Sequence, residues 1–142
     1  MPDPIVVGTC LCGAVHFEVE GKIDRVAHCH CTICQRSHGA AFATWAAIPK
    51  PRVRVTAGEA ELTHFRSSEI GTRSFCRRCG SSLFCTLDTH PDDVDVALAS
   101  LEPGHGATPA AHLFWDDRVP WLEAGAGDSL AKLGGKSGME PR

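Results

Sequence analysis

Seven of the eight cysteines in this chain of 142 residues lie in three tight clusters. The first cluster is a C-x-C pair, the second a C-x-C-x2-C triplet and the third a C-x2-C pair. Thiolates are strong ligands for zinc, which prefers four tetrahedral ligands at a Zn–S distance of ~2.3 Å. A glycine follows each pair and allows the backbone to curl, so that both sulfurs can face one ion. The clusters are Cys10/Cys12, Cys29/Cys31/Cys34 and Cys76/Cys79.

The cluster sizes predict two different metal sites. The two pairs together make a four-cysteine set, the composition of a closed structural zinc site, whereas the triplet offers three ligands and leaves a fourth place free. Joining the triplet to a cysteine of another cluster would strand an odd thiol there. Disulfides are the alternative explanation of the clusters. Cys85 is left over, and we expect a buried thiol in a strand; alternatively, it or a histidine closes the second site.

A three-cysteine site with a free place predicts thiol chemistry. A substrate thiol that took the fourth place would lose its proton and become a nucleophile for a carbonyl carbon. Three electron-donating thiolates favour delivery of a nucleophile over polarisation of a carbonyl. A general acid would then protonate the new alkoxide, and we expect His30, which lies between two ligands. The other histidines of suitable type are His28, His38, His64 and His112.

The triplet with its zinc would carry a net charge of −1, which opposes a second anion. Arg36, two residues past Cys34, is the expected source of compensating positive charge. Eight basic and three acidic residues lie between Arg36 and Arg78, whereas the whole chain carries −3. This segment either attracts an anionic ligand or places its basic side chains on solvated strand faces. The negative overall charge and the lack of a long basic run argue against a nucleic-acid partner.

The elements that must position these cysteines are predicted to be mainly strands. Val15, Phe17 and Val19 alternate with polar residues, and Val53 and Val55 do the same, which is the period of a half-buried strand. Glycine and proline turn signals separate the segments, so we expect antiparallel β-sheets. One short helix is expected around residues 35–38. Further strands are expected at 42–48, 61–66, 72–76, 82–87 and 94–98.

The length and composition indicate one domain. Hydrophobic residues make up 43% and charged residues 22%, which are ordinary globular values. No run of ~18 apolar residues predicts a membrane span, and the N-terminus lacks the features of a signal peptide, so we expect a cytoplasmic protein. Residues 124–142 are rich in glycine, serine and charge and are expected to form a loosely ordered tail. Trp115 and Trp121 are expected to pack in the core.

The three clusters and their surroundings resemble the glutathione-dependent formaldehyde-activating enzyme family, which also includes centromere protein V. The resemblance covers about residues 5 to 123, and Pro120-Trp121 fits its closing pattern. It implies a zinc-stabilised, β-tent-like single domain of antiparallel sheets over residues 1–123. The motifs that carry it are T-C-L-C-G-A-V at 9–15, C-H-C-T-I-C-Q-R at 29–36, G-A at 39–40, F-A-T-W at 42–45 and R-S-F-C-R-R-C-G-S-S-L-F at 73–84.

The resemblance also implies an activity and its ligands. The founding reaction of the family joins glutathione and formaldehyde to S-hydroxymethylglutathione, formally a carbon–sulfur lyase working in reverse. The implied partners are a small thiol and an aldehyde, with two zinc ions per chain. Alternatives are a non-catalytic zinc- or thiol-binding protein and an interaction module. The family sites assign Cys10, Cys12, Cys76 and Cys79 to structural zinc, and Cys29, Cys31 and Cys34 to catalytic zinc.

Overall fold

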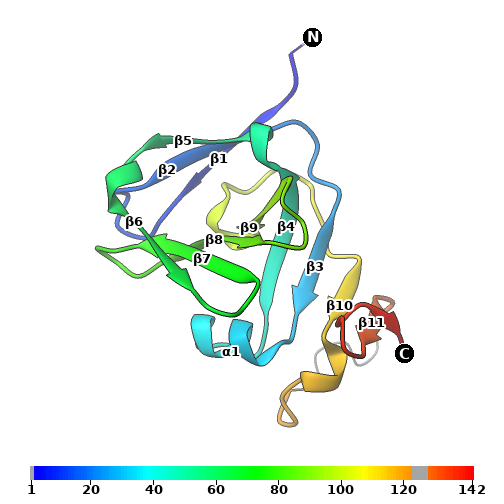
Figure 1. Cartoon of the computed structure of the whole chain (residues 1–142). Helices are drawn as coiled ribbons and strands as arrows, with labels where there is room; N and C mark the ends of the chain where they lie inside the picture. Colours follow the sequence, from blue (N-terminus) through cyan, green and yellow to red (C-terminus); the bar gives the residue numbers. More distant parts are fainter. Residues whose placement is uncertain (1, 123–127) are drawn as a thin grey trace. The chain divides into compact units, whose positions relative to one another are not determined.

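The computed structural model describes residues 2–122 and 128–142 (Figure 1). Internal contacts divide the chain into two compact units, which are described separately below. Unit 1 comprises Met1–Asp24 and Ala46–Ala107, and unit 2 comprises Arg25–Trp45 and Thr108–Arg142. Within the described residues the chain forms twelve strands, one α-helix and four short 3₁₀ helices. The expected mainly β class is therefore confirmed.

A three-stranded antiparallel sheet forms one part of unit 1 (Figure 1). The strand β2 (His16–Glu20) lies in its middle and pairs with β1 (Ile5–Thr9) and with β5 (Val53–Ala57). The predicted alternation in β2 buries Phe17 completely. Gly8 on β1 makes room for that ring, since a Cβ at this position would lie 2.1 Å from the Phe17 Cζ atom.

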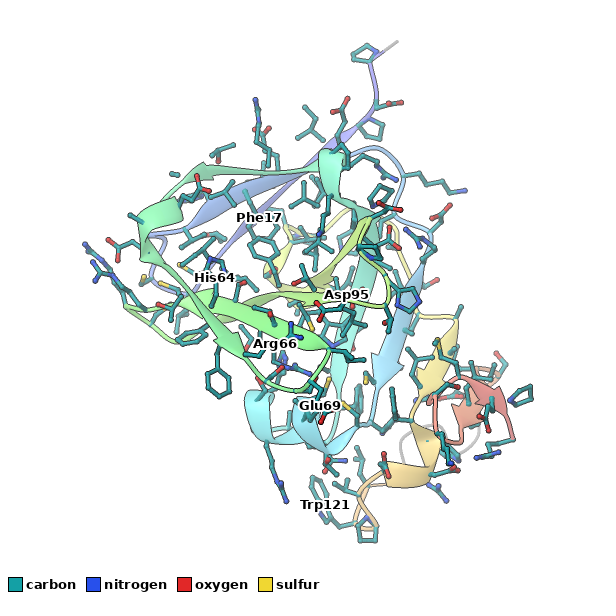
Figure 2. The ribbon with its side chains drawn as sticks, in the orientation of Figure 1. Phe17, His64, Arg66, Glu69, Asp95 and Trp121 are labelled. Carbon is teal, nitrogen blue, oxygen red and sulfur yellow. The ribbon has the colours of Figure 1, made fainter. Side chains whose placement is uncertain are left out.

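A second antiparallel sheet of unit 1 carries the later strands in the order β9-β8-β7-β6. Phe17, labelled in Figure 2, packs edge-on against Phe84 of β8 with ring centroids 4.8 Å apart, so the two sheets of unit 1 share a core. The four strands are β6 (Leu62–Arg66), β7 (Gly71–Cys76), β8 (Ser82–Leu87) and β9 (Asp93–Ala97). The short 3₁₀ helices of this unit are η1 (Lys50–Arg52), η2 (Glu59–Glu61) and η3 (Leu98–Ser100).

Unit 2 contains a mixed sheet, which differs from the wholly antiparallel expectation. The short strand β10 (Ala111–Leu113) lies parallel to β3 (Val26–Cys29) and to β11 (Ala131–Gly134). The strand β11 then pairs antiparallel with β12 (Glu140–Pro141). Long connections precede β10 and β11, and parallel strands need such crossover connections.

The helix α1 (Thr32–His38) is the one α-helix among the described residues. It starts three residues before the expected range because Cys31 caps its first turn: the Cys34 amide donates to the Cys31 sulfur. It ends at Gly39, whose φ of 58° lies in the left-handed region that favours glycine. The following strand β4 (Ala43–Pro49) starts in unit 2 and ends in unit 1.

The C-terminal segment is more regular than its composition predicts. The segment expected to be loosely ordered, 124–142, contains both β11 and β12, although residues 124–127 lie outside the described residues. Arg142 pairs with Asp116 of η4 (Trp115–Asp117) at 2.7 Å and ties the C-terminal residue to that helix within unit 2. The expected domain boundary at residue 123 stays a prediction.

Trp121 does not pack in a core, contrary to the expectation from its sequence neighbourhood. Its exposed fraction is 71%, whereas Trp115 is half-buried. Pro120 directly precedes it, and both residues lie in a turn outside any strand or helix, where side chains commonly stay at the surface. Among the described residues, none of the helices has the length and apolar character needed to cross a bilayer.

Candidate metal centres

Unit 1 brings the two cysteine pairs together. Cys10 follows β1, Cys12 lies in the turn towards β2, Cys76 ends β7 and Cys79 lies in the turn towards β8. The four sulfur atoms all lie within 4.8 Å of one another. The Cys10 and Cys12 sulfurs are 3.7 Å apart, and those of Cys12 and Cys76 are 3.8 Å apart. The structure therefore groups the four cysteines that sequence reasoning grouped.

These sulfur separations fit a tetrahedral metal ion. A Zn–S bond of ~2.3 Å with tetrahedral angles requires neighbouring sulfurs to lie ~3.8 Å apart. A disulfide would require ~2.0 Å. All eight cysteines are free thiols in the structure. The distances therefore favour a shared ion over the disulfide alternative.

Two glycine turns aim the four sulfurs at one point. Gly13, with φ of 80°, follows Cys12, and its amide donates to the Cys10 carbonyl at 3.2 Å. Gly80, with φ of 78°, follows Cys79, and its amide donates to the Cys76 carbonyl at 2.7 Å. Both backbones occupy the left-handed region, where a side chain would be strained. The glycines thus serve the role that the sequence pattern predicted.

Hydrogen bonds to sulfur make one of these thiols acidic. The Ser81 hydroxyl and amide donate to the Cys79 sulfur, and together with the Cys12 amide they lower the pKa of Cys79 to about 5. The Ala14 amide lowers the pKa of Cys12, but burial and the neighbouring thiols outweigh it and raise that pKa to about 11. Four sulfurs this close cannot all ionise without a cation, so the donor set suits a divalent metal.

The two arginines inside the C-x2-C turn pair with a carboxylate. Arg77 and Arg78 lie 2.5 Å and 3.1 Å from the carboxylate oxygens of Glu61. Their guanidinium groups lower the pKa of Glu61 to about 2. The Arg77 amide also donates to the Glu61 carbonyl at 2.8 Å. These contacts anchor the turn that carries Cys76 and Cys79 to η2.

Unit 2 brings the cysteine triplet together. Cys29 ends β3, Cys31 caps α1 and Cys34 lies in its first turn, with all three sulfurs within 4.8 Å of one another. Among the residues that the structure describes, no histidine, carboxylate or further cysteine joins this group. The alternative in which a histidine or Cys85 closes the site thus finds no support there.

Two N–H groups of unit 2 donate to sulfurs of the triplet. The Cys34 amide lies 3.3 Å from the Cys31 sulfur, and the Trp45 indole nitrogen lies 3.5 Å from the Cys34 sulfur. The neighbouring thiols, Cys31 first and then Cys34, together with burial raise the pKa of Cys29 well above its usual range. Three crowded sulfurs again call for a cation if they are to be thiolates.

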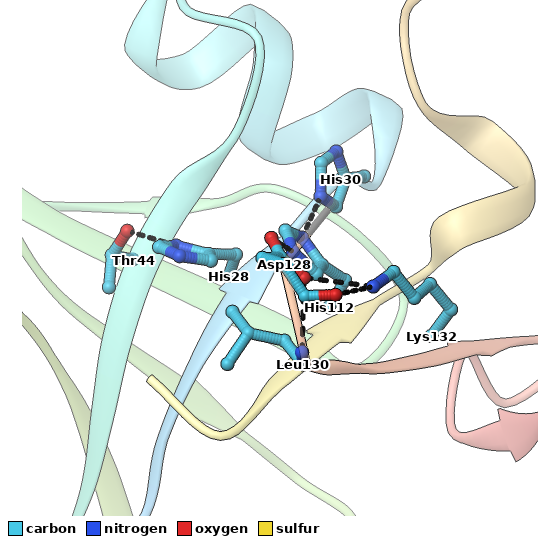
Figure 3. A network of polar contacts seen from close by, with 7 residues as sticks. All are labelled: His28, His30, Thr44, His112, Asp128, Leu130 and Lys132. Carbon is cyan, nitrogen blue, oxygen red and sulfur yellow. Dashed lines mark hydrogen bonds and ion pairs between the residues drawn. The ribbon is translucent and has the colours of Figure 1, made fainter. Parts of the chain in front are cut away.

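His30 belongs to a histidine network rather than to the sulfur group (Figure 3). Its ring is 1% exposed, and its Nε2 atom lies 2.7 Å from Nδ1 of His112, which is also 1% exposed. The other His112 nitrogen, Nε2, lies 3.1 Å from Asp128. Burial, and then the neighbouring His112 and His28, lower the pKa of His30 to about 4, so its ring is neutral near pH 7.

The remaining histidine candidates have other partners. The Nδ1 atom of His28 lies 2.8 Å from the Thr44 hydroxyl (Figure 3), and burial lowers the pKa of His28. The His38 ring packs edge-on against Trp45 at 5.3 Å. His64 lies in unit 1, on β6, and its Nδ1 atom is 2.6 Å from the Ser74 hydroxyl. Of the five candidates, His28, His30 and His112 therefore form one cluster beside the end of β3.

Arg36 and Gln35 lie side by side on α1 but differ in their surroundings. Arg36 is exposed, as a residue that meets an anionic ligand from solvent must be. The Gln35 amide donates to the His30 carbonyl at 2.7 Å and to the Asp117 carbonyl at 2.9 Å. Gln35 thus ties the cysteine loop to η4. Sequence reasoning missed Gln35, because only the fold brings residue 117 near residue 30.

A second cation of unit 2 was also missed. The Arg118 guanidinium lies 4.4 Å above the centre of the Trp115 ring, and that ring is 5.2 Å from the His30 ring. Arg118 is exposed. One of its N–H groups, on Nη1, donates to the Trp115 carbonyl at 2.9 Å. No pattern in the sequence links residue 118 to the triplet.

Comparison with known families identifies the chain. A model of the glutathione-dependent formaldehyde-activating enzymes matches residues 5–117, which is most of the sequence. The chain therefore belongs to that family, and the resemblance drawn from the cysteine motifs is confirmed.

The names of several relatives agree with this assignment, and a solved structure shares the fold. A protein of Halomonas elongata is 28% identical over 127 residues, which cover 84% of this chain and 80% of that protein. Proteins of Colletotrichum graminicola and Podospora anserina are 30% and 32% identical, and the matches cover 63% of this chain. All three carry names that assign them provisionally to glutathione-dependent formaldehyde-activating enzymes. A crystal structure of a Rhodobacter sphaeroides protein has a TM-score of 0.60 and 31% identity, covering 69% of this chain and 89% of that one.

The relatives differ in length. The matches cover only 51% and 44% of the Colletotrichum and Podospora proteins, so the chain spans about half the length of these two relatives.

Proposed function

We propose that this chain is a zinc-dependent enzyme of the carbon–sulfur lyase type, which adds a small thiol such as glutathione to an aldehyde such as formaldehyde and reverses that addition. The observation that carries the proposal is the triplet Cys29, Cys31 and Cys34. Its sulfurs lie within 4.8 Å of one another, and among the described residues no histidine, carboxylate or further cysteine joins them. Membership of the family supports the substrate classes.

The two cysteine groups would hold two zinc ions with different roles. Cys10, Cys12, Cys76 and Cys79 offer a complete tetrahedral set, which is the composition of a structural site. Cys29, Cys31 and Cys34 offer three ligands, which is the number found in reactive sites. When bound by the triplet, zinc would supply the positive charge that favours the ionised form of a substrate thiol.

The reaction needs a proton carrier but no oxidant or reductant. A bond forms between the thiol sulfur and the carbonyl carbon, the thiol loses its proton and the carbonyl oxygen gains one. We propose His30 as the group that takes this proton and returns it to the oxygen. Its ring is neutral near pH 7, because burial lowers its pKa to about 4, so it must accept a proton before it can act as an acid.

The electrostatic surroundings of the triplet also fit an anionic substrate. The Trp45 indole and the Cys34 amide donate to ligand sulfurs and stabilise their negative charge. Arg36 is exposed on α1, two residues from Cys34, and is proposed to attract the carboxylates of a glutathione-like thiol.

Exchange spectroscopy tests this function directly. With ¹³C-labelled formaldehyde and glutathione at equilibrium, the rate of interconversion between free aldehyde and adduct is measured by NMR with and without protein. We expect the wild-type protein to raise this rate by ~10²-fold or more, the scale of general acid–base catalysis. Cys31→Ser should return it to the spontaneous rate.

The matched control is Ile33→Val, a conservative change at an exposed position between two of the ligands. It should keep the wild-type rate. A wild-type protein with zinc bound that accelerates exchange for none of several small thiols would overturn the proposal and favour a non-catalytic binding module.

A further inference from the structure

A chain of hydrogen bonds runs from the partly exposed carboxylate of Asp128 to the buried ring of His30, the residue between Cys29 and Cys31 (Figure 3). Asp128 Oδ2 lies 3.1 Å from His112 Nε2, and His112 Nδ1 lies 2.7 Å from His30 Nε2. Both histidines are 1% exposed. All three residues belong to unit 2, and figure and distances agree on their order.

The hydrogen-bond donors around Asp128 determine which atom donates in its contact with His112. The Leu130 amide and the Lys132 ammonium group donate to Oδ1 of Asp128, at 3.0 Å and 2.8 Å. The other oxygen, Oδ2, faces His112 Nε2. An ionised carboxylate only accepts hydrogen bonds, so His112 must carry a proton on Nε2.

The same reasoning continues to the next ring. A neutral imidazole with a proton on Nε2 has an unprotonated Nδ1, which accepts. With His112 neutral, the 2.7 Å contact between its Nδ1 and His30 Nε2 therefore needs a proton on Nε2 of His30. The Nδ1 atom of His30 is then left without a proton.

We propose that Asp128, acting through His112, is a positioning residue that holds His30 in the tautomer protonated on Nε2. The inference deepens the proposed function and rests on it for its catalytic meaning. In that tautomer Nδ1 is the unprotonated nitrogen of His30, and so the ring atom that would take up a proton in the proposed reaction. Holding a neutral histidine in one tautomer through a carboxylate is a known way to orient a catalytic ring.

Asp128→Asn provides a sharp test, because it should move the proton of each histidine ring to the other ring nitrogen. The Leu130 amide and Lys132 keep donating to Oδ1, so the new NH2 group must replace Oδ2 opposite His112 Nε2. An NH2 group only donates, so Nε2 of His112 must then accept. His112 moves its proton to Nδ1 and donates it to His30 Nε2, which leaves His30 protonated on Nδ1.

Long-range ¹H–¹⁵N NMR spectra at pH 8 read these tautomers, because a protonated ring nitrogen and an unprotonated one have well-separated shifts. In the zinc-loaded wild-type protein we expect Nε2 to be the protonated nitrogen of both His30 and His112. In Asp128→Asn we expect Nδ1 in both. The matched control is Asp117→Asn, an exposed aspartate of the same unit, which should leave both tautomers as in wild type.

Three results would overturn the inference: a wild-type His30 protonated on Nδ1, a wild-type His112 protonated on both nitrogens, or unchanged tautomers in a folded Asp128→Asn. The wild-type spectrum alone tests the first two of these results. The inference can therefore be overturned even if Asp128→Asn fails to fold.

A kinetic measurement on Asp128→Asn separates this inference from the proposed function. If the wild-type protein accelerates thiol–aldehyde exchange, Asp128→Asn should lower kcat more than ~10-fold with little change in KM, as expected for a ring in the wrong tautomer. An unchanged kcat with reversed tautomers would refute the catalytic meaning of Nδ1. A wild type without activity would refute the proposed function, while the spectra would still decide the tautomer of His30.

Discussion

The sulfur atoms of Cys12 and Cys76 lie 3.8 Å apart, although the two cysteines are 64 positions apart in sequence. Their turns leave β1 and β7, which belong to different sheets of unit 1. A metal ion held between them would close a long loop, and such a link removes more freedom from the unfolded chain than a short one does. The four-cysteine group is therefore placed to stabilise the fold of unit 1.

Removing one ligand of this group should unfold unit 1 or severely destabilise it. Structural zinc contributes ~10–16 kcal/mol of apparent binding free energy in zinc-finger peptides, which is as large as the net stability of a typical domain. We expect Cys79→Ser or Cys10→Ser to lose one zinc per chain and the cooperative melting transition. Metal analysis and calorimetry measure both. A Cys79→Ser protein with two zinc ions and unchanged melting would disprove the structural assignment.

Removing one ligand of the triplet should have a much smaller effect on stability. Cys29 and Cys34 are only five positions apart, so a metal held there closes a short loop and constrains little of the chain. We expect Cys31→Ser to keep the fold and one zinc per chain and to melt within a few degrees of wild type. Equal losses of stability in Cys31→Ser and Cys79→Ser would show that the structural and reactive roles are wrongly assigned to the two cysteine groups.

Gln35 should matter for the link between α1 and η4. Gln35→Ala removes the amide that donates to the carbonyls of His30 and Asp117. Loss of these bonds should cost ~1 kcal/mol, which corresponds to a fall in Tm of ~2–4 °C for a chain of this size. Ser37→Ala, an exposed change on the same helix, is the control and should melt like wild type. A fall of equal size in both variants would mean that the loss reflects α1 as a whole.

The ion pair between Asp116 and Arg142 should make the attachment of the C-terminal strands to η4 sensitive to acid. The Arg142 guanidinium and the Gly135 amide lower the pKa of Asp116 to about 2. A carboxyl with a pKa depressed in the folded state stabilises it fully above its ordinary pKa of ~3.9 and loses that effect as the pH falls to ~2. Protection of the Arg142 amide, which donates to the Lys132 carbonyl at 3.1 Å, reports this attachment by hydrogen exchange.

The comparison with Asp116→Asn isolates this carboxyl from metal loss, which acid causes in both proteins. Arg142 should be better protected in wild type than in the variant at pH 6, and the two should converge near pH 2. Equal protection at pH 6 would show that the pair with Arg142 does not hold the strands.

Sequence patterns predicted well the elements and ligands whose signals are local. The alternation around Phe17 placed β2, and turn residues bounded β8 at 82–87, the range that the structure has. The grouping of Cys10, Cys12, Cys76 and Cys79 followed from cluster sizes, since each short spacing places its sulfurs together.

Other features escaped because their signals are not local. The strands β3, β10 and β11 have only three or four residues and pair in parallel across long connections, so they show no alternation. Asp128 lies in a segment whose composition predicts loose order, and only the fold brings it to His112. The sequence shows that His30 lies between two cysteines, but it does not show that the His30 ring faces His112.

The central claim is that the triplet holds a metal with room for one more thiolate, and a titration of glutathione into the cobalt-substituted protein tests it most directly. Sulfur-to-cobalt charge-transfer absorption grows with each thiolate bound, and soft thiolates suit a thiolate-rich metal. Seven cysteine thiolates should give the starting intensity, and saturating glutathione should add about one seventh of it. Arg36→Ala should raise the midpoint ~2–5-fold, the scale of one exposed charge, whereas the exposed Arg54→Ala should not. No change in absorption with glutathione or any other small thiol at saturation would contradict the claim.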